Sequence, residues 1–212
     1  MKKTIIILSI FALLVSGCRQ IGSKQTAVSN ASLTSDEGVV INGIKWATRN
    51  VDEFGTFTKN PEDAGKFYQW NRKMAWNTTD KDVANWDISD ITSSIWEKEN
   101  DPCPTGWRVP TPDELQSLID GQKVYRKWTT QNGVIGYKFT DRATNDTLFL
   151  PAVGYRNDGS LRKANMFGCY WGSPQRESYE TLVYFMEFEV VGIRIHGSNR
   201  RWDGFSVRCV AE

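Results

Sequence analysis

Histidine is nearly absent from this sequence, because His196 is the only one among 212 residues. A zinc site built on two or more imidazoles is therefore excluded, and any catalytic triad that uses histidine would depend on this one residue. The sequence also has no large excess of charge of either sign, with 26 Lys and Arg against 25 Asp and Glu. Proteins that neutralise nucleic-acid phosphates need such an excess of positive charge, so we expect no nucleic-acid partner.

Three other signatures are missing: a glycine-rich phosphate-binding loop, a coiled-coil heptad pattern and an apolar run long enough to span a membrane as a helix. We expect no cofactor. Large aromatic residues are abundant, with nine Trp, ten Phe and seven Tyr. They supply enough apolar surface for the core of a domain of about 170 residues, which excludes a disordered chain.

The N-terminus has the pattern of an exported protein. Lys2 and Lys3 precede a mostly apolar run over residues 5–15, which is too short to span a bilayer but has the length of a secretory signal. The run ends in Val15-Ser16-Gly17-Cys18, which resembles the lipobox of bacterial lipoproteins, where the chain is cut before a cysteine that carries lipid. Residues 1–17 are predicted to be a signal peptide and Cys18 the lipidated residue. The alternative is an ordinary secretory signal with an incidental cysteine.

The lipid makes a bacterial membrane the first expected partner and places the protein in the cell envelope as an outer-membrane lipoprotein. Residues 19–38 are mostly small and polar, have no aromatic side chain and show no periodicity, so residues 18–38 are predicted to be the lipidated cysteine and a flexible tether. The globular domain is predicted at residues 39–212. Whether it faces the periplasm or the cell surface is left open, because Arg19 and Gln20 stand where a resembling surface-export signal has acidic residues.

Local motifs predict several elements of the domain. Asn42-Gly43 lies between two apolar runs, which is the strongest short-range signal for a β-hairpin. Pro61, followed by acidic residues, predicts the start of a short helix. Thr111-Pro112-Asp113-Glu114 is a capping box, and Gly121 is placed to end the helix of about nine residues that follows it.

The second half of the chain is predicted to be mainly sheet, because short runs rich in β-branched and aromatic residues alternate with turn dipeptides. Residues 71–100 are predicted to form a long irregular loop pinned by tryptophans. The runs predicted as strands are 137–140, 147–150, 182–191, 193–195 and 205–210, with a turn at Asp158-Gly159.

Four blocks of the sequence together resemble one known family. They are Cys103–Thr111 with Glu114, Gly154–Arg156 with Gly159–Leu161, Tyr170–Ser173, and Gly204–Val210. The set resembles the Fibrobacter succinogenes major paralogous domain, which is common in Bacteroidetes-type lipoproteins and is similar to the folds of C-type lectins and of formylglycine-generating enzyme. The resemblance implies an α+β, C-type-lectin-like fold that is loop-rich, with short helices packed on twisted antiparallel sheet and with the two ends of the chain meeting.

The resemblance also implies a disulfide bond between Cys103 and Cys209, because it brings the last strand back beside the segment that precedes the capped helix. An exported domain lies in an oxidising compartment, where such a bond persists. With Cys18 lipidated, three cysteines remain, so at most one intramolecular pair can form. Cys169 is then expected to be a reduced, buried thiol.

Tryptophan and arginine side chains are the candidate ligand-binding residues. Aromatic faces stack on sugar rings, but the same side chains fill ordinary cores. Arg200 and Arg201, close to His196, could meet an anion or a glycan carboxylate, or could simply face outward from a strand. The candidates for an exposed aromatic platform are the tryptophans in polar stretches: Trp76, Trp86, Trp96 and Trp202.

Two other kinds of site remain as alternatives. Cys169 and His196 could act as nucleophile and base, because a thiolate needs a nearby imidazole, but no third orienting residue can be named. Residues 80–90 are rich in the carboxylates that calcium favours, but the glycine and the spacing of an EF-hand are missing. We therefore predict neither a catalytic residue nor a metal site.

The expected function is that of a non-catalytic envelope lipoprotein whose loops bind an extracellular glycan or protein, because loops on a rigid scaffold commonly carry binding sites. The alternative is a structural or accessory subunit of a surface appendage or envelope complex. An exposed aromatic cleft would favour the binding function, whereas an apolar patch or an unpaired strand edge would favour the alternative. An enzyme ranks third and would need Cys169 and His196 together in a pocket.

Overall fold

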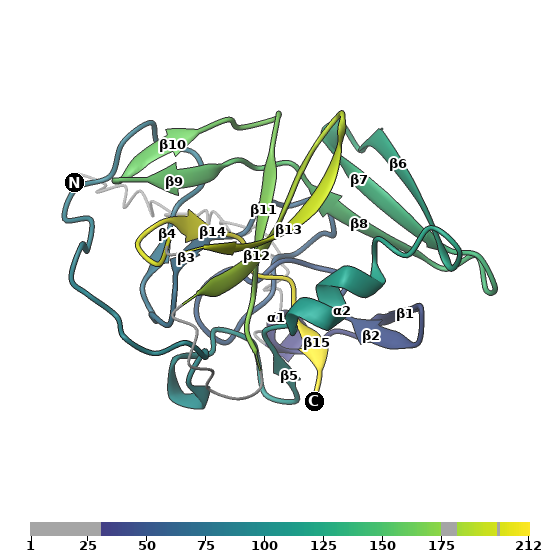
Figure 1. Cartoon of the computed structure of the whole chain (residues 1–212), viewed down its shortest axis with the longest axis horizontal. Helices are drawn as coiled ribbons and strands as arrows, with labels where there is room; N and C mark the ends of the chain where they lie inside the picture. Colours follow the sequence, from purple (N-terminus) through teal and green to yellow (C-terminus); the bar gives the residue numbers. More distant parts are fainter. Residues whose placement is uncertain (1–30, 175–181, 199) are drawn as a thin grey trace, which may run out of the picture.

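The computed structural model describes residues 31–174, 182–198 and 200–212. The predicted signal peptide, Cys18 and the first part of the predicted tether lie outside these residues. The described chain is built mainly of short antiparallel strands joined by long loops, with short helices (Figure 1). At this level the prediction of a loop-rich α+β domain is confirmed. No helix in the described ranges is long and apolar enough to cross a membrane.

The two ends of the domain meet in a sheet of order β1-β2-β15-β5. Asn42 and Gly43 both have positive φ, as the two-residue turn requires, so the predicted hairpin is confirmed. Near the end of the chain, Val210 pairs with Trp46 on one side and with Arg108 on the other. The strands of this sheet are β1 (Val39–Ile41), β2 (Ile44–Trp46), β5 (Trp107–Arg108) and β15 (Val210–Ala211).

A second sheet, of order β10-β9-β14-β3-β4, carries the loops of the candidate site. The helix predicted at Pro61 is wrong, because an irregular segment leads from there into β3. Gly65 has positive φ, which a right-handed helix does not allow, and its backbone lies so close to the carbonyl oxygen of Val51 that no Cβ would fit. The strands are β3 (Phe67–Gln69), β4 (Ala75–Trp76), β9 (Tyr155–Asn157), β10 (Ser160–Arg162) and β14 (Gly204–Phe205).

A third sheet, of order β11-β12-β13, separates two hydrophobic cores. Successive residues of a strand point to opposite faces, so Cys169 and Trp171 of β11 join one core while Tyr170 joins the other. The same alternation places Phe185 and Phe188 of β12 in different cores. The strands are β11 (Gly168–Gly172), β12 (Val183–Glu189) and β13 (Gly192–Ser198).

The fourth sheet, of order β6-β7-β8, contains a strand that the sequence analysis did not predict. This strand is β6, which joins β7 through Asn132 and Gly133, both with positive φ. The strands predicted at 137–140 and 147–150 are confirmed within β7 and β8. The strands are β6 (Val124–Gln131), β7 (Val134–Asp141) and β8 (Thr147–Pro151).

The capped helix is α2 (Pro112–Ser117). Its capping box is confirmed, because the Thr111 hydroxyl accepts from Glu114 N–H and the Glu114 carboxylate accepts from Thr111 N–H. The helix ends earlier than expected. The backbone N–H groups of Leu118 and Ile119 donate to carbonyls only three residues back, as in a 3-10 turn. The α-helix therefore ends at Ser117 and does not continue to Gly121.

The strand predicted at 205–210 is only partly formed, because the chain crosses between two sheets there. Ser206 N–H donates to the carbonyl of Cys169, and the Ser206 carbonyl accepts from Trp171 N–H, both at 3.0 Å. Farther on, the Cys209 carbonyl accepts from Ala47 N–H at 2.9 Å. The crossing therefore ties β11 to the sheet that holds the two ends of the domain.

The disulfide bond between Cys103 and Cys209 is present, with a Cα–Cα separation of 6.1 Å. It links the segment before β5 to the residue before β15. Cys169 is a free, buried cysteine, as expected. Its side chain lies in the core beside Trp171.

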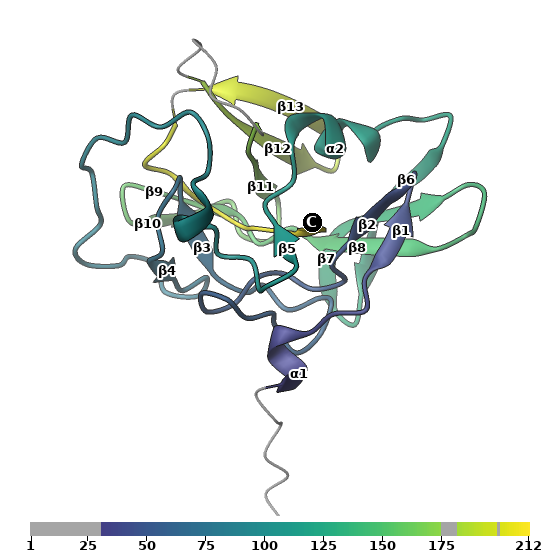
Figure 2. The same cartoon turned by 90° about the horizontal axis from the view of Figure 1, so that it is seen from below.

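Residues 31–38, which the sequence analysis places in the tether, contact the domain. Figure 2 shows α1 (Ala31–Thr34) at the bottom of the described chain. The Leu33 carbonyl accepts from Phe57 N–H at 2.6 Å. The Asp36 carboxylate is 1% exposed and accepts from Thr48 and from the Arg49 guanidinium. Burial alone would raise the pKa of Asp36, but these hydrogen bonds outweigh it and lower the pKa.

Candidate functional site

Three of the four predicted platform tryptophans lie together on the second sheet. Trp76 of β4 and Trp86 of the 77–90 loop have ring centroids 4.8 Å apart. The Trp86 indole N–H donates to the carbonyl of Trp202 at 3.0 Å. Trp76 and Trp86 are half-buried, whereas Trp202 is 45% exposed. We call these three residues, with the hollow beside Trp202, the Trp202 surface.

Gly204 makes room for the Trp86 ring on the sheet. A Cβ at Gly204 of β14 would lie 2.8 Å from Cη2 of Trp86. Real Cβ atoms do not approach other atoms so closely, so the Trp86 ring can pack on the sheet here only because Gly204 has no side chain. The sequence block that contains Gly204 thus helps to place Trp86.

The hollow beside Trp202 has a volume of about 250 Å³ and is lined by Ile88, Asn157, Asp158 and Trp202. Ile88 is 72% exposed. Asp158 and Gly159 both have positive φ and form the turn between β9 and β10, which leaves the Asp158 side chain exposed. An aromatic face, an aliphatic side chain, an amide and a carboxylate therefore meet at one place. This combination suits a ligand with an apolar face and hydroxyl groups.

The Trp202 backbone is held in place from several sides. Its carbonyl accepts from Gln69 Nε2 at 3.0 Å as well as from Trp86. The next residue, Asp203, is fully buried and accepts from Asn157 Nδ2 at 2.8 Å and from Arg200 Nε. A buried carboxylate with charged and neutral donors fixes the loop, so the exposed indole is presented on a rigid base.

Neither of the two predicted ligand-binding arginines lines this hollow. Arg200 is ion-paired with Asp203, and its guanidinium lies 5.2 to 5.9 Å from the ring centroids of Tyr155, Phe205 and Phe185. Arg201 is only 8% exposed. The role that the structure gives Arg200 is to hold the loop, because its charge is already shared with Asp203 and with aromatic faces.

Trp96 is apart from the other three, and the prediction that it is an exposed platform residue is wrong. It is 7% exposed, and its indole N–H donates to the carbonyl of Asn100 at 2.7 Å. Its ring packs on Trp70 and Trp171, with centroid distances of 5.1 and 6.2 Å. Burial in this aromatic cluster outweighs the polar character of the neighbouring sequence.

Arg156 positions the site, and sequence reasoning gave it no role. Its guanidinium is fully buried and donates to the carbonyls of Asn77, Asp80 and Gly159 at 2.9, 2.8 and 2.6 Å. These bonds join the 77–90 loop to the turn that carries Asp158. Burial lowers the pKa of Arg156, since its partners are carbonyls rather than carboxylates. Arg156 lies in one of the sequence blocks that carry the resemblance, and this was the only signal for it. The residue types in that block do not indicate which backbone carbonyls the guanidinium binds.

Cys169 and His196 are not arranged to act as a nucleophile and its general base. Cys169 is 1% exposed, and burial raises the pKa of its thiol well above the ordinary value, which keeps it protonated. In the strand register, Cys169 lies opposite Glu187, whereas His196 lies opposite Phe185 and stacks on its ring. The two residues therefore occupy different positions along the third sheet.

Three of the four carboxylates of residues 80–90 have separate partners. Asp80 accepts from Asn77 Nδ2, Asp82 accepts from the Ser160 hydroxyl, and Asp87 is paired with Arg72. Within the ranges that the structure describes, no group of three or more His, Cys, Asp and Glu side chains is arranged to hold a metal ion. The hydrogen bonds of this loop instead fasten it to the second sheet.

Comparisons of the chain with protein-family models, with curated proteins and with solved structures gave no match. One scaffold can carry many unrelated sites, so function has to be argued from the site itself. The chemistry of the Trp202 surface is therefore the main guide to function.

Proposed function

We propose that the chain is a non-catalytic lipoprotein of a bacterial outer membrane, anchored through lipid on Cys18, whose domain binds an extracellular glycan at the Trp202 surface. The anchor is supported by the apolar run and by Val15-Ser16-Gly17-Cys18. Mass spectrometry of the membrane fraction tests it: a lipidated N-terminal Cys18 and loss of residues 1–17 are expected. A soluble, unmodified chain that retains residue 1 would contradict the anchor.

The fold proposed for the domain is C-type-lectin-like, as in the Fibrobacter succinogenes major paralogous domain. Its support is the meeting of the two chain ends through Val210 and Trp46, the short helix after the capping box, and the long loops. The bond between Cys103 and Cys209 also lies within two of the sequence blocks that carry the resemblance.

The observation that carries the binding function is the exposed indole of Trp202 beside the exposed carboxylate of Asp158. The apolar C–H face of a sugar ring stacks on an aromatic face, and a carboxylate accepts hydrogen bonds from sugar hydroxyls. Asp158 would repel an acidic sugar, and the Arg200 charge that could offset this is paired with Asp203. The glycan is therefore proposed to be neutral.

A glycan array probed with the full chain in detergent tests this function. Trp202→Ala is expected to weaken binding of a neutral glycan by about tenfold or more, as for a central aromatic contact residue. Tyr125→Ala is the matched control, because Tyr125 is also a half-exposed aromatic but lies on β6. Equal binding by both variants, or a preference for acidic glycans, would contradict the proposal.

A second candidate function, that of a structural or accessory subunit of an envelope complex, is favoured by a separate observation. In the described residues β6 pairs only with β7, and β13 pairs only with β12. Each of these strands therefore leaves one edge of unpaired backbone groups, to which a partner strand can add. Chemical crosslinking in whole envelopes would favour this function if β6 or β13 reacts with another protein and Trp202→Ala has no effect on any ligand.

A further inference from the structure

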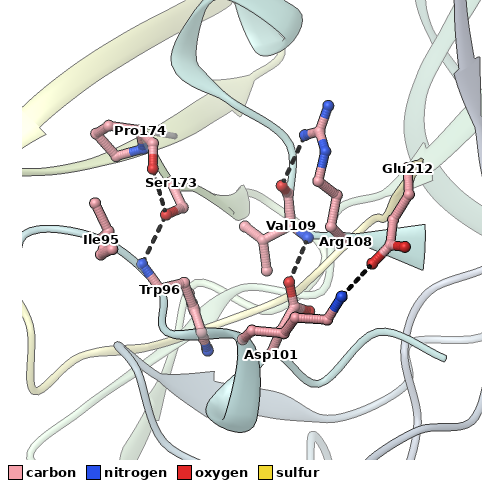
Figure 3. Close-up of a pocket in the computed structure, with 9 residues that line it drawn as sticks. Ile95, Trp96, Asp101, Arg108, Val109, Ser173, Pro174 and Glu212 are labelled. Atoms are coloured by element: carbon pink, nitrogen blue, oxygen red, sulfur yellow. Dashed lines mark hydrogen bonds and ion pairs between the residues drawn. The ribbon is translucent and has the colours of Figure 1, made fainter. Parts of the chain in front are cut away.

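A second cavity, of about 390 Å³, lies next to β5 and the end of β11 (Figure 3). It shares no lining residue with the hollow beside Trp202. Its volume falls within the range of small-molecule sites in proteins. We call it the Asp101 pocket, after the carboxylate in its wall.

The apolar part of the Asp101 pocket is formed by Ile95, Trp96, Val109 and Pro174. This wall is preformed. Trp96 is fixed by the core around its ring, and its backbone N–H donates to the Ser173 hydroxyl at 2.7 Å. The same hydroxyl donates to the Pro174 carbonyl at 3.1 Å, and Figure 3 shows how these bonds connect the two sides of the opening.

The two cationic side chains that line the Asp101 pocket, Arg108 and Lys98, both have carboxylate partners. Arg108 Nη1 and Nη2 donate to the two oxygens of Glu114 at 2.8 and 2.6 Å. Lys98, in the 3-10 helix η1 (Lys98–Asn100), has its Nζ 3.6 Å from Glu212. The half-buried Arg108 is thus neutralised by Glu114, and Lys98 is 91% exposed with Glu212 beside it, so neither offers a desolvated, unpaired charge to an acidic ligand.

Asp101 is the carboxylate of the pocket wall that is not ion-paired with Arg108 or Lys98. Its Oδ1 accepts from Cys103 N–H at 2.9 Å and its Oδ2 accepts from Val109 N–H at 3.0 Å. Each carboxylate oxygen can accept two hydrogen bonds, so both retain acceptor capacity in a residue that lines the cavity. Within the described ranges the ion pairs of Arg108 and Lys98 are made with Glu114 and Glu212 instead. Burial raises the pKa of Asp101, which reflects a desolvated charge that these two amides do not fully compensate.

We infer that the Asp101 pocket binds a primary ammonium group attached to a small apolar body. The ammonium would donate to Asp101, and the apolar body would contact Trp96 and Ile95. A charge-assisted bond to a carboxylate is about twice as strong as a neutral one, so the positive charge is the main recognition feature. Such a group can come from a free amine or from the N-terminus of a peptide.

Isothermal titration of the full chain in detergent with three related probes tests this inference. We expect 2-phenylethylammonium to bind at least tenfold more tightly than 2-phenylethanol, which has the same ring but no charge, and 3-phenylpropanoate not to bind. Equal binding of the three probes, tighter binding of the carboxylate, or no binding of the ammonium would overturn the inference.

Peptides distinguish the two sources of the ammonium. If Phe-Gly-Gly amide with a free N-terminus binds more tightly than 2-phenylethylammonium, the natural ligand is a peptide end. If only 2-phenylethylammonium binds, the natural ligand is a small amine. The N-acetylated peptide is expected not to bind in either case, and its binding as tightly as the free peptide would overturn the inference.

Three variants locate the site. Asp101→Asn is expected to weaken binding of 2-phenylethylammonium by about tenfold, whereas Asp90→Asn, an exposed carboxyl away from the pocket, leaves it unchanged. Should Asp101→Asn fail to fold, Ile95→Trp fills the cavity from a half-buried position and is expected to abolish binding. Full binding by Ile95→Trp, or full binding by a folded Asp101→Asn, would overturn the inference.

Discussion

The indole N–H of Trp86 donates to the backbone carbonyl of Trp202 at 3.0 Å, although the two residues are 116 positions apart in the chain. One half-buried tryptophan thus fixes the backbone of another whose ring faces solvent. The exposed ring of Trp202 therefore depends on a side chain that makes no direct contribution to the hollow.

Trp86→Phe separates these two roles. Phenylalanine keeps an aromatic contact with Trp76 but cannot donate to the Trp202 carbonyl. The free energy of unfolding is expected to fall by about 1 kcal/mol for the lost hydrogen bond, and glycan binding to weaken several-fold because the loop is less fixed. Urea denaturation and titration with the glycan measure the two effects. Unchanged binding together with a stability loss would show that the Trp202 loop is held without Trp86.

Gly204→Ala tests the packing of Trp86 against the second sheet. The new Cβ would lie 2.8 Å from Trp86 Cη2 and 3.3 Å from Cβ atoms of Arg156 and Phe67, so the ring has to move. The free energy of unfolding is expected to fall by about 1 to 3 kcal/mol, as for other overpacked sites. Gly192→Ala is the matched control, since a Cβ there meets nothing within 4 Å. Equal denaturation midpoints for the two variants would contradict this packing.

The bond between Cys103 and Cys209 closes a segment of 106 residues. Restricting so long a loop in the unfolded chain stabilises the folded state by about 4 to 5 kcal/mol in the entropic model. The double variant Cys103→Ala, Cys209→Ala is expected to lose stability of this order in urea denaturation. A reducing agent should destabilise the original chain but leave the double variant unchanged. An equal response of both proteins would show that the bond is absent in solution.

Tyr170 is expected to stay protonated in the folded protein at pH 11. Burial raises the pKa of its phenol to about 12, and the hydroxyl donates to the Pro151 carbonyl at 2.9 Å. An unfolded tyrosine has a pKa of about 10. The folded pKa is the higher one, so the stabilisation linked to Tyr170 is complete below pH 10 and is lost as the pH rises through 12.

Absorbance at 295 nm measures tyrosine ionisation directly. The original chain and Tyr170→Phe are expected to give the same increase at pH 11 while folded. After unfolding in guanidinium, the original chain should show the signal of one additional tyrosinate. A difference between the two folded proteins at pH 11 would mean that Tyr170 titrates normally.

Features set by neighbouring residues could be predicted from the sequence. The Asn42-Gly43 turn and the Thr111–Glu114 capping box depend on backbone preferences within four residues, and both are present. Strand β6 was missed although Asn132-Gly133 carries the same turn signal. After Pro61 the local preference for a helix is outweighed by a long-range contact, because Gly65 takes positive φ and its backbone lies against the carbonyl of Val51.

The candidate site was harder to predict, because exposure is a tertiary property. Trp96 and Trp202 both stand in polar sequence, yet one is 7% and the other 45% exposed. Arg156 donates to backbone carbonyls from two separate loops, and no pattern of side chains in the sequence indicates these partners. The disulfide was predictable only through the resemblance of whole sequence blocks.

The attachment of residues 31–36 determines how mechanical load enters the domain. Tension on the proposed lipid anchor first reaches Leu33, which accepts from Phe57 N–H, and the buried carboxylate of Asp36, which is bonded to Gly38 before β1 and to Thr48 after β2. These strands belong to the sheet whose last strand follows Cys209 and its covalent bond. The Trp202 loop is fastened through Gln69 and Asn157 to a different sheet, so tension on the tether reaches the first sheet before it reaches this loop.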